Sequence, residues 1–351
     1  LRAAGVRTGL FTSPHLIEPT ERIQIDGLAV SPADFERAFN VVHETAEKLD
    51  LDCHPTYFET VTAMAFWLFR EKKIHTAVIE VGLGGRLDST NVVRPVLTVI
   101  TPVDFDHEAY LGHTIEAIAG EKAGIVKPDV PLVLARQRPE AAAVILARAA
   151  ELGAPVTRAE DFEVRDLVLD ARGSRFSGLV CPLAGEHQVD NAVTAVLALQ
   201  ALGVDPAGIA DAQWPGRIEH VSPNPDVILD GAHNPAGARA LARYLERFYS
   251  GRRIWLVYGA MRDKAIDEVA EILFPIAGEL VLTAPDTPRA LRPEALQEFA
   301  GRGHVEPSVA AAVDYAKSHA VPEDVIVITG SLYLVGEARR LFLAPTGGRW
   351  Q

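Results

Sequence analysis

The residues best suited to chemistry lie in one short segment, from Glu80 to Asn91, which reads Glu-Val-Gly-Leu-Gly-Gly-Arg-Leu-Asp-Ser-Thr-Asn. It follows a β-branched run at 75–79, which is typical of a buried parallel strand. Open α/β sheets bind ligands at the carboxyl ends of such strands. A purely structural loop needs the glycines, but not an acid at the strand end and an arginine six residues later. The segment therefore predicts a ligand-binding loop.

The next predicted strand also leads into polar residues. It spans Val96–Thr101 and is followed by 104–112, Asp-Phe-Asp-His-Glu-Ala-Tyr-Leu-Gly, which contains His107. If the two strands are adjacent and parallel, Glu80 and His107 come close together. A carboxylate and an imidazole suit a divalent cation, and Mg²⁺ normally takes few protein ligands and keeps phosphate oxygens or waters for the rest. We therefore expect a magnesium site at these strand ends.

A series of further segments, spread almost from end to end, resembles the folylpolyglutamate synthase/dihydrofolate synthase family of the Mur ligase superfamily. Each match is weak alone, but all occur in the family's order. Besides the two loops above, the matching segments are Phe11–Leu16, Glu21–Gly27, Thr56–Glu59, Glu121–Gly124, His187–Asn191, Gly216–Glu219, Asp230–Pro235 and Thr329–Tyr333.

The resemblance implies an ATP-dependent ligase of folate biosynthesis. Such an enzyme adds L-glutamate to dihydropteroate, to the γ-carboxylate of a folate, or to both, through an acyl phosphate. ATP, L-glutamate and the folate compound would be its small-molecule substrates, with Mg²⁺ as cofactor. We expect a cytoplasmic monomer.

The resemblance also assigns residues around the transferred phosphoryl group. Ser13, Glu80 and His107 are implied to be Mg²⁺ ligands. Arg22 and Arg86 are implied to lie near the anionic substrate and the phosphoryl group, where a bidentate guanidinium fits.

Lys122 is implied to be carbamylated, as the corresponding lysine is in the resembled family. Helix lysines are ordinarily solvated, and that alternative stays open here. However, Ile118 and Ile125 lie one turn to either side, so Lys122 is near a buried stripe. The modification requires a neutral amine, which burial favours.

The folate compound is implied to contact Thr56, Phe58 and Asp88. Thr56 and Glu59 also have the spacing of a capping box, which is a structural device. An aromatic ring at Phe58 can stack on a pterin while the cap still forms, so both interpretations can hold.

The remaining implied site residues lie later in the chain. Asn191, Arg217 and Asp230 would bind the base, phosphates and ribose of ATP, and Asp at a strand end is a common ribose partner. His233 and Ser331 would bind the incoming glutamate. A solvent-facing helix asparagine is the plain alternative at Asn191.

The resemblance also reveals two differences from the family. The family begins with a Gly-rich phosphate loop of the Gly-Thr-Asn-Gly-Lys-Gly-Ser type, and this sequence contains no such segment. Such a loop holds ATP phosphates with backbone N–H groups and a lysine. Because the chain opens at Leu1 without Met, we expect it to be N-terminally incomplete, and its activity as it stands is not assumed. The segment 261–265 has Ala265 where the family commonly has Asp.

Composition limits the possible partners. The net charge of −13 argues against nucleic-acid or anionic-membrane binding as the main task, because both need a positive surface. No apolar run reaches about 18 residues, the length that a membrane span needs. Cys53 and Cys181 have no metal-type spacing and fit a reducing cytosol.

Alternating strand and helix patterns predict an α/β fold with a mostly parallel, doubly wound sheet and a smaller Rossmann-like C-terminal domain. At 351 residues, two domains are expected. We assign 1–218 to an ATP- and folate-binding Mur-ligase central domain that lacks its first strand and phosphate loop, and 219–351 to a glutamate-binding domain. The turn-rich connection at 216–225 separates them, and an antiparallel hairpin is expected from Phe162–Leu169 and Arg175–Val180.

Three other functions are possible. A Mur ligase for a cell-wall precursor would share the fold, but the segments at 11–16 and 56–59 favour folate. A nicotinamide dehydrogenase would use Gly82–Gly85, but Arg94-Pro95 prevents the long helix that its fingerprint requires. A non-catalytic binding module without a phosphate loop is the third.

Overall fold

The computed structural model describes residues 1–49, 51–262 and 266–343. Residue contacts divide the chain into two compact units, Leu1–Val164 with Asp190–Asp211, and Arg165–Val189 with Ala212–Gln351. Ala265, the departure from the family noted above, lies outside the described residues. Among the described helices, none is long and apolar enough to cross a membrane.

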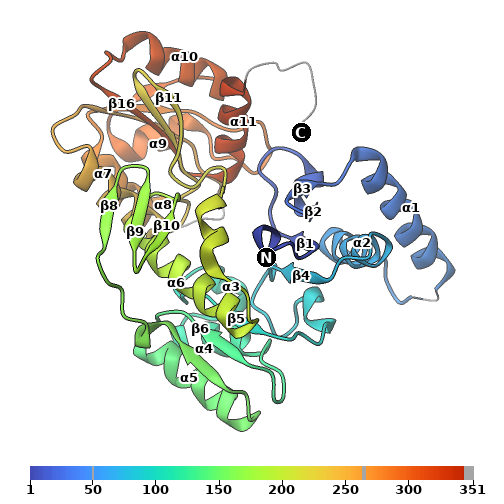
Figure 1. The fold of residues 1–351 in the computed structure, drawn as a ribbon. Helices are drawn as coiled ribbons and strands as arrows, with labels where there is room; N and C mark the ends of the chain where they lie inside the picture. Colours follow the sequence, from blue (N-terminus) through green and yellow to red (C-terminus); the bar gives the residue numbers. More distant parts are fainter. Residues whose placement is uncertain (50, 263–265, 344–351) are drawn as a thin grey trace. The chain divides into compact units, whose positions relative to one another are not determined.

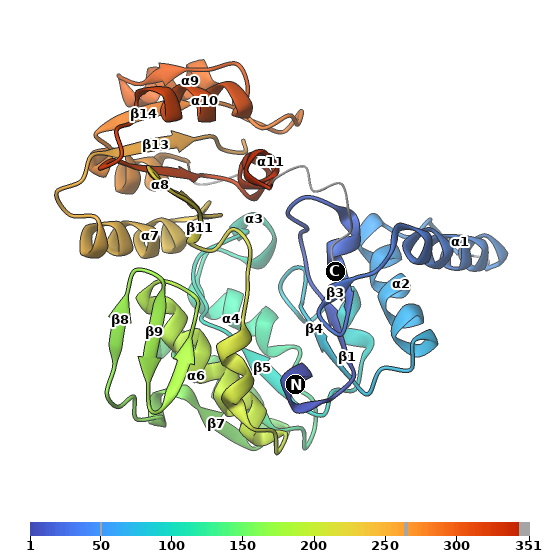
Figure 2. The same cartoon turned by 45° about the horizontal axis from the view of Figure 1, so that its top comes forward.

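The first unit contains a four-stranded sheet in the order β3-β2-β1-β4. Its strands are β1 (Thr8–Phe11), β2 (Ile23–Ile25), β3 (Leu28–Ala29) and β4 (Thr76–Ile79). β1 pairs with β4 in parallel and with β2 antiparallel, so residues after β1 and β4 lie at one edge of the sheet. The helices α1 (Pro32–Lys48) and α2 (Tyr57–Glu71) pack beside these strands (Figures 1 and 2).

Both helices begin as the sequence predicts. The Ser31 hydroxyl accepts from the Asp34 N–H at 3.0 Å, with proline at the first helical position. Thr56 and Glu59 form the predicted capping box at the start of α2. These side chains satisfy N–H groups that a helix start leaves without partners.

A second, three-stranded parallel sheet in the same unit has the order β5-β6-β7. The strands are β5 (Thr98–Ile100), β6 (Leu132–Leu134) and β7 (Val156–Arg158), and α4 (Ile115–Ala123) and α5 (Pro139–Glu151) share their buried core. β4 and β5 are therefore edge strands of two different sheets, and the expectation that they are adjacent is wrong. β4 is also partly exposed, with Val78 at 49%, so the expectation of a buried strand at 75–79 is wrong as well. A β-branched run indicates a strand but fixes neither its neighbour nor what covers it.

The second unit is built on a six-stranded sheet in the order β11-β12-β16-β13-β14-β15. Its strands are β11 (Glu219–Pro223), β12 (Asp226–Leu229), β13 (Ile254–Tyr258), β14 (Glu279–Leu282), β15 (His304–Val305) and β16 (Val325–Thr329). All neighbouring pairs are parallel except β11 with β12. The region predicted as a turn-rich connection thus contains β11, which pairs back on β12 through the turn at Asn224-Pro225.

Helices cover both faces of this sheet. Alternate strand residues such as Ile228 and Leu256 share a core with α7 (Pro235–Phe248) and α8 (Ile266–Leu273). On the other face, the Trp255 ring contacts Tyr315 of α10 (Val309–His319). The central strands are almost fully buried, which explains their continuous β-branched sequences.

The predicted antiparallel hairpin around 170–173 is present, and a third strand extends it into a three-stranded sheet. Its strands are β8 (Val168–Asp170), β9 (Gly173–Phe176) and β10 (Leu179–Cys181). Ser177 and Gly178 have φ angles of 49° and 77°, and this left-handed pair reverses the chain inside the stretch predicted as one strand.

The remaining helices complete the two units. They are α3 (Glu108–Leu111), α6 (Glu186–Ala201), α9 (Pro293–Ala300), α11 (Leu332–Phe342), and 3₁₀ helices at Arg2–Ala4, Pro19–Arg22, Ser89–Val92, Ala159–Asp161, Pro206–Asp211 and Phe274–Ile276.

Candidate active site

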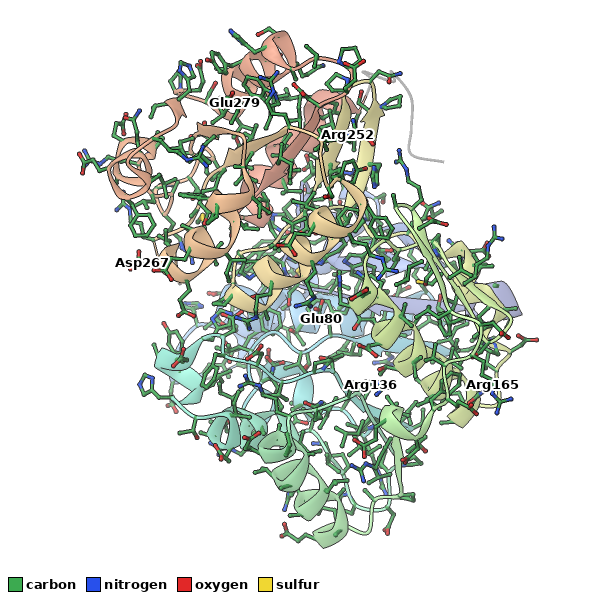
Figure 3. All side chains as sticks on the ribbon, turned by 90° about the vertical axis from the view of Figure 1, so that its left-hand side faces the viewer. Glu80, Arg136, Arg165, Arg252, Asp267 and Glu279 are labelled. Carbon is green, nitrogen blue, oxygen red and sulfur yellow. The ribbon has the colours of Figure 1, made fainter. Side chains whose placement is uncertain are left out.

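In the first unit, Ser13 and Glu80 meet at the carboxyl edge of the β1–β4 pair. The Ser13 N–H donates to Glu80 Oε2 at 2.8 Å. Glu80, labelled in Figure 3, is an exposed side chain. Its hard oxygen atoms at an open strand end fit a magnesium ligand. Among the described residues, no group of three or more His, Cys, Asp or Glu side chains could hold a metal ion. The predicted set has only two side chains of these kinds, Glu80 and His107.

Asp88 shapes the loop that follows Glu80. Its carboxylate accepts from the N–H groups of Gly82 at 3.0 Å, Leu83 at 2.9 Å and Thr90 at 2.9 Å. It also caps the 3₁₀ helix Ser89–Val92. Both oxygens therefore hold the loop backbone, while the place of Asp88 in a folate pocket stays a prediction.

The same loop packs tightly between two helices. A Cβ at Gly82 would lie 2.4 Å from the Phe58 ring of α2, and a Cβ at Gly85 would lie 2.8 Å from the Glu121 carbonyl of α4. Only glycine allows these approaches. Arg86 Nη2 then pairs with Glu121 Oε1 at 2.9 Å, which holds the predicted phosphoryl-binding arginine against α4.

Lys122 is half-buried near the end of α4. Burial lowers the pKa of its ammonium group, and the negative charge of Asp106 opposes this shift. Within the described residues, the ammonium group makes no hydrogen bond or ion pair. This environment increases the neutral fraction of the amine. It differs from the environment of an ordinary solvated helix lysine, which was the alternative for Lys122.

His107 is exposed at the start of α3 and has a φ of 53°, in the left-handed region. Asp106, which the sequence analysis did not single out, accepts from the His107 N–H at 2.8 Å and lies 3.7 Å from its Nε2. The charge of Asp106 opposes the lowering of the Lys122 pKa, and α3, which begins at His107, contacts α4.

Arg22 is buried, with only 8% of its surface exposed. Its Nε donates to His15 Nδ1 at 2.9 Å, and its guanidinium lies 5.3 Å from the Tyr57 ring centroid. The Glu21 carboxylate accepts from backbone N–H groups of the 16–18 segment. The first matched segments and the start of α2, where Thr56 and Phe58 lie, therefore form one contact network.

In the second unit, Asp230 is 7% exposed at the end of β12. Its oxygens accept from the Ile218 and Ala232 N–H groups, each at 2.9 Å. Burial raises the pKa of this carboxyl, whereas the charge of Arg217 and the two hydrogen bonds lower it. A Cβ at Gly231 would lie 2.6 Å from Arg217 Nη1, so the arginine lies over this strand end.

His233 and Ser331 are brought to neighbouring strand ends, as expected. β12 pairs in parallel with β16, and the Gly330 N–H donates to the Ala232 carbonyl at 3.1 Å. His233 Nδ1 lies 2.8 Å from the Gly231 carbonyl oxygen. Ser331 is 1% exposed, and its hydroxyl accepts from the Leu334 N–H as the N-cap of α11.

Asn191 belongs to the first unit and is exposed on α6, whereas Arg217 and Asp230 belong to the second unit. Their common role in binding ATP stays a prediction.

Comparison with known proteins identifies the family of the chain. A model of the Mur ligase middle domain matches residues 34–199, and a model of the Mur ligase glutamate ligase domain matches residues 216–332. Folylpolyglutamate synthase of Lacticaseibacillus casei is 38% identical over 98% of this chain and 85% of that protein. The chain belongs to the folylpolyglutamate synthase/dihydrofolate synthase family.

Solved structures of the family have the same fold. Mycobacterium tuberculosis folylpolyglutamate synthase complexed with ADP and AMPPCP superposes with a TM-score of 0.90 at 37% identity, covering 99% of this chain and 86% of that one. E. coli FolC in complex with DHPP and ADP superposes with a TM-score of 0.86 at 32% identity, covering 97% of this chain and 82% of that one. The predicted α/β Mur-ligase fold is confirmed.

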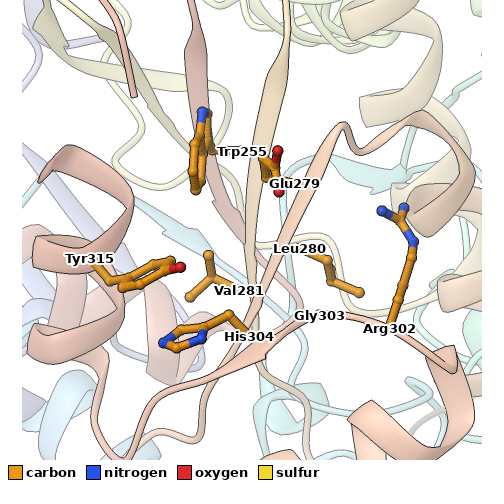
Figure 4. Close-up of a pocket in the computed structure, with 8 residues that line it drawn as sticks. All are labelled: Trp255, Glu279, Leu280, Val281, Arg302, Gly303, His304 and Tyr315. Carbon is orange, nitrogen blue, oxygen red and sulfur yellow. The ribbon is translucent and has the colours of Figure 1, made fainter. Parts of the chain in front are cut away.

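Within this family fold, one cavity among the described residues lies away from the predicted site residues. It has a volume of about 320 Å³ and lies beside Trp255, Glu279, His304 and Tyr315 (Figure 4). None of the predicted site residues lines it. His304 stacks on Tyr315 with ring centroids 3.8 Å apart, and Trp255 donates to Asp324, so these side chains are engaged with one another.

Proposed function

We propose that the protein is an ATP-dependent ligase that adds L-glutamate to dihydropteroate, to the γ-carboxylate of a folate, or to both. The observation that carries this proposal is the 38% identity to a folylpolyglutamate synthase over 98% of the chain. The substrate carboxylate attacks the γ-phosphate of ATP to give an acyl phosphate and ADP. The glutamate amine then attacks the acyl carbon, and phosphate leaves.

Residues of the first unit would serve the phosphoryl transfer. Glu80, Ser13 and His107 would hold Mg²⁺, which neutralises phosphate charge when bound. Support comes from the exposed Glu80 carboxylate at the strand end and its 2.8 Å contact with Ser13. Arg22 and Arg86 would neutralise the anionic substrate and the phosphoryl group.

Lys122 would be carbamylated, because burial favours the neutral amine that reacts with CO₂. The carbamate would be an anion that positions the phosphoryl-transfer groups. Thr56, Phe58 and Asp88 would bind the folate compound. Phe58 has an aromatic face for a pterin, and Asp88 would act through the loop that it holds.

In the second unit, Asp230 and Arg217 would bind ribose and phosphate, and His233 and Ser331 would bind glutamate. The close packing of these residues at paired strand ends supports this assignment. Asn191 of the first unit would contact the base. We place the domain boundary at 218/219, near the start of the second domain match at 216. The enzyme would act as a cytoplasmic monomer.

The test is turnover with purified protein, Mg²⁺, ATP and L-glutamate, using dihydropteroate and tetrahydrofolate in separate reactions. We expect ADP release that depends on both glutamate and the folate compound, with a product one glutamyl unit heavier by mass spectrometry. ADP release without a glutamylated product would contradict the ligase proposal. Product from a UDP-linked muramyl precursor alone would place the protein with the cell-wall ligases.

A further inference from the structure

A cluster of three basic side chains lies beside the second unit's strand-end site. The first is His187, in the opening turn of α6. A Cβ at Gly185 would lie 2.7 Å from His187 Cε1 and 3.1 Å from Ile218 Cδ1. The imidazole therefore lies over glycine backbone and against the segment that carries Arg217.

The second basic side chain is Arg217, which lies over another glycine, Gly231. Its Nη1 would be 2.6 Å from a Cβ at Gly231, and the next residue, Ile218, donates its N–H to the buried Asp230 carboxylate. Glycine at 185 and at 231 thus leaves room for an imidazole and a guanidinium to approach the backbone.

Arg243 of α7 is the third member. Arg247, one turn later, pairs its Nη1 with Glu186 Oε1 at 2.5 Å. Residues four apart share a helix face, so Arg243 is directed to the start of α6, where His187 follows Glu186. The sequence analysis did not single out Arg243 or His187.

The charges within the cluster are consistent with this geometry. Burial, then the charges of Arg217 and Arg243, lower the pKa of His187 to about 4, so its imidazole is neutral at pH 7. Among the described residues, none of the three side chains has a hydrogen-bond or ion-pair partner. Arg217 acts on the nearby Asp230 carboxylate, but its guanidinium N–H groups and those of Arg243 have no hydrogen-bond acceptor among the described residues. Two such guanidinium groups beside a neutral imidazole suit an anion with several oxygen atoms.

We propose that His187 and Arg243 complete, with Arg217, a phosphate-binding subsite for a nucleoside polyphosphate. This rests on the proposed function, in which Arg217 and Asp230 bind ATP. Arg243 supplies a second cation. His187 is a positioning residue that separates the two guanidinium groups without adding charge and can donate one N–H to a phosphate oxygen.

Calorimetric titration with ATP, ADP and adenosine tests the subsite. Arg243→Gln should weaken ATP and ADP binding by roughly tenfold or more, as expected for the loss of one charge-assisted hydrogen bond, and leave adenosine unchanged. Arg247→Gln is the matched control, because it removes the same charge from the same helix face but its partner is Glu186. In turnover, KM for ATP should rise while KM for glutamate stays constant.

His187→Gln keeps a hydrogen-bonding side chain, so it should weaken ATP binding less than His187→Ala does. Thermal unfolding of each variant controls for folding. Two results would overturn the subsite alone. One is an equal loss of affinity for ATP and for adenosine. The other is an Arg243→Gln variant that binds ATP as well as Arg247→Gln does, while Arg217→Gln loses ATP binding. An unmodified protein that binds none of the three ligands would overturn the proposed function together with the subsite.

Discussion

Glu80 and Asp230 occupy equivalent places in the two units, but their environments are opposite. Each follows a parallel strand and precedes a glycine-containing turn. The Glu80 side chain is exposed, and its Oε2 accepts from the backbone N–H of Ser13. The Asp230 side chain is 7% exposed, and both of its oxygens accept from backbone N–H groups.

This difference separates two kinds of strand-end acid. An exposed carboxylate can take a cation without breaking the fold, whereas a buried carboxylate that holds two backbone segments supports the site by fixing its backbone. We therefore expect substitutions at Glu80 to reduce turnover with little change in stability. Substitutions at Asp230 should reduce both.

The largest effect is expected at Lys122. If its carbamate is required, Lys122→Ala should lower turnover by about 100-fold or more, because a group that acts in the transition state is removed. Stability should change far less, since the side chain makes no hydrogen bond within the described residues. ADP release with saturating folate and glutamate measures this.

Lys48→Ala is the control for Lys122→Ala, because the Lys48 side chain is 77% exposed and should be silent. A small acid such as acetate should partly restore the Lys122→Ala enzyme by occupying the vacated space. Normal turnover in that variant would end the carbamate proposal.

Glu80→Gln sharpens the comparison in the first unit. The amide oxygen can still accept from the Ser13 N–H, so the free energy of unfolding should change by under about 0.5 kcal/mol. Turnover should fall by roughly 10- to 100-fold, and higher Mg²⁺ should recover part of it, because a neutral amide binds the cation more weakly. An unchanged Mg²⁺ dependence would contradict a metal role for Glu80.

Asp230→Asn tests the other side of the comparison. An amide NH₂ would face either the Ile218 or the Ala232 N–H, leaving a buried donor without an acceptor. The expected cost is about 1–3 kcal/mol of unfolding free energy, measured by urea denaturation. Asp314→Asn, at an exposed position of α10, is the matched control. Equal stability of the two variants would show that Asp230 does not hold the backbone.

Local features were predictable from the sequence because their causes are local. The caps at Ser31 and Thr56 follow from side chains that reach N–H groups three residues away. The strand ends at Glu80 and Asp230 follow from β-branched runs that stop at an acid and a glycine.

Features that depend on distant pairing were not predictable. β4 and β5 were expected to be neighbours, but backbone pairing places them in different sheets. The edge strand β11 reads as a connection because it is short and flanked by prolines. The cluster of His187 and Arg243 joins two helices far apart in sequence, and no spacing rule connects them.

The smallest effect is a pH trend that separates Asp230 from Asp324, a second buried aspartate of the same unit with 4% exposure. Burial alone would raise the pKa of Asp324, but hydrogen bonds from Arg253 at 2.8 Å, Trp255 at 2.9 Å and the Val321 N–H at 3.1 Å hold it below the ordinary 3.8. A lowered pKa gives stability that is present above the unfolded value and lost as pH falls through the folded one.

The pKa of Asp230 is raised, so its effect on stability has the opposite pH dependence. The stability that it contributes is fully present below the unfolded-state pKa and is lost as pH rises through the folded-state pKa. The destabilisation caused by Asp324→Asn should therefore grow as pH rises from the acid side, whereas that caused by Asp230→Asn should shrink. Each unit of pKa difference is worth about 1.4 kcal/mol, which sets the scale of both trends. Urea unfolding of the wild type and both variants across the acid range measures them. Parallel trends would contradict opposite shifts of the two carboxyl pKa values.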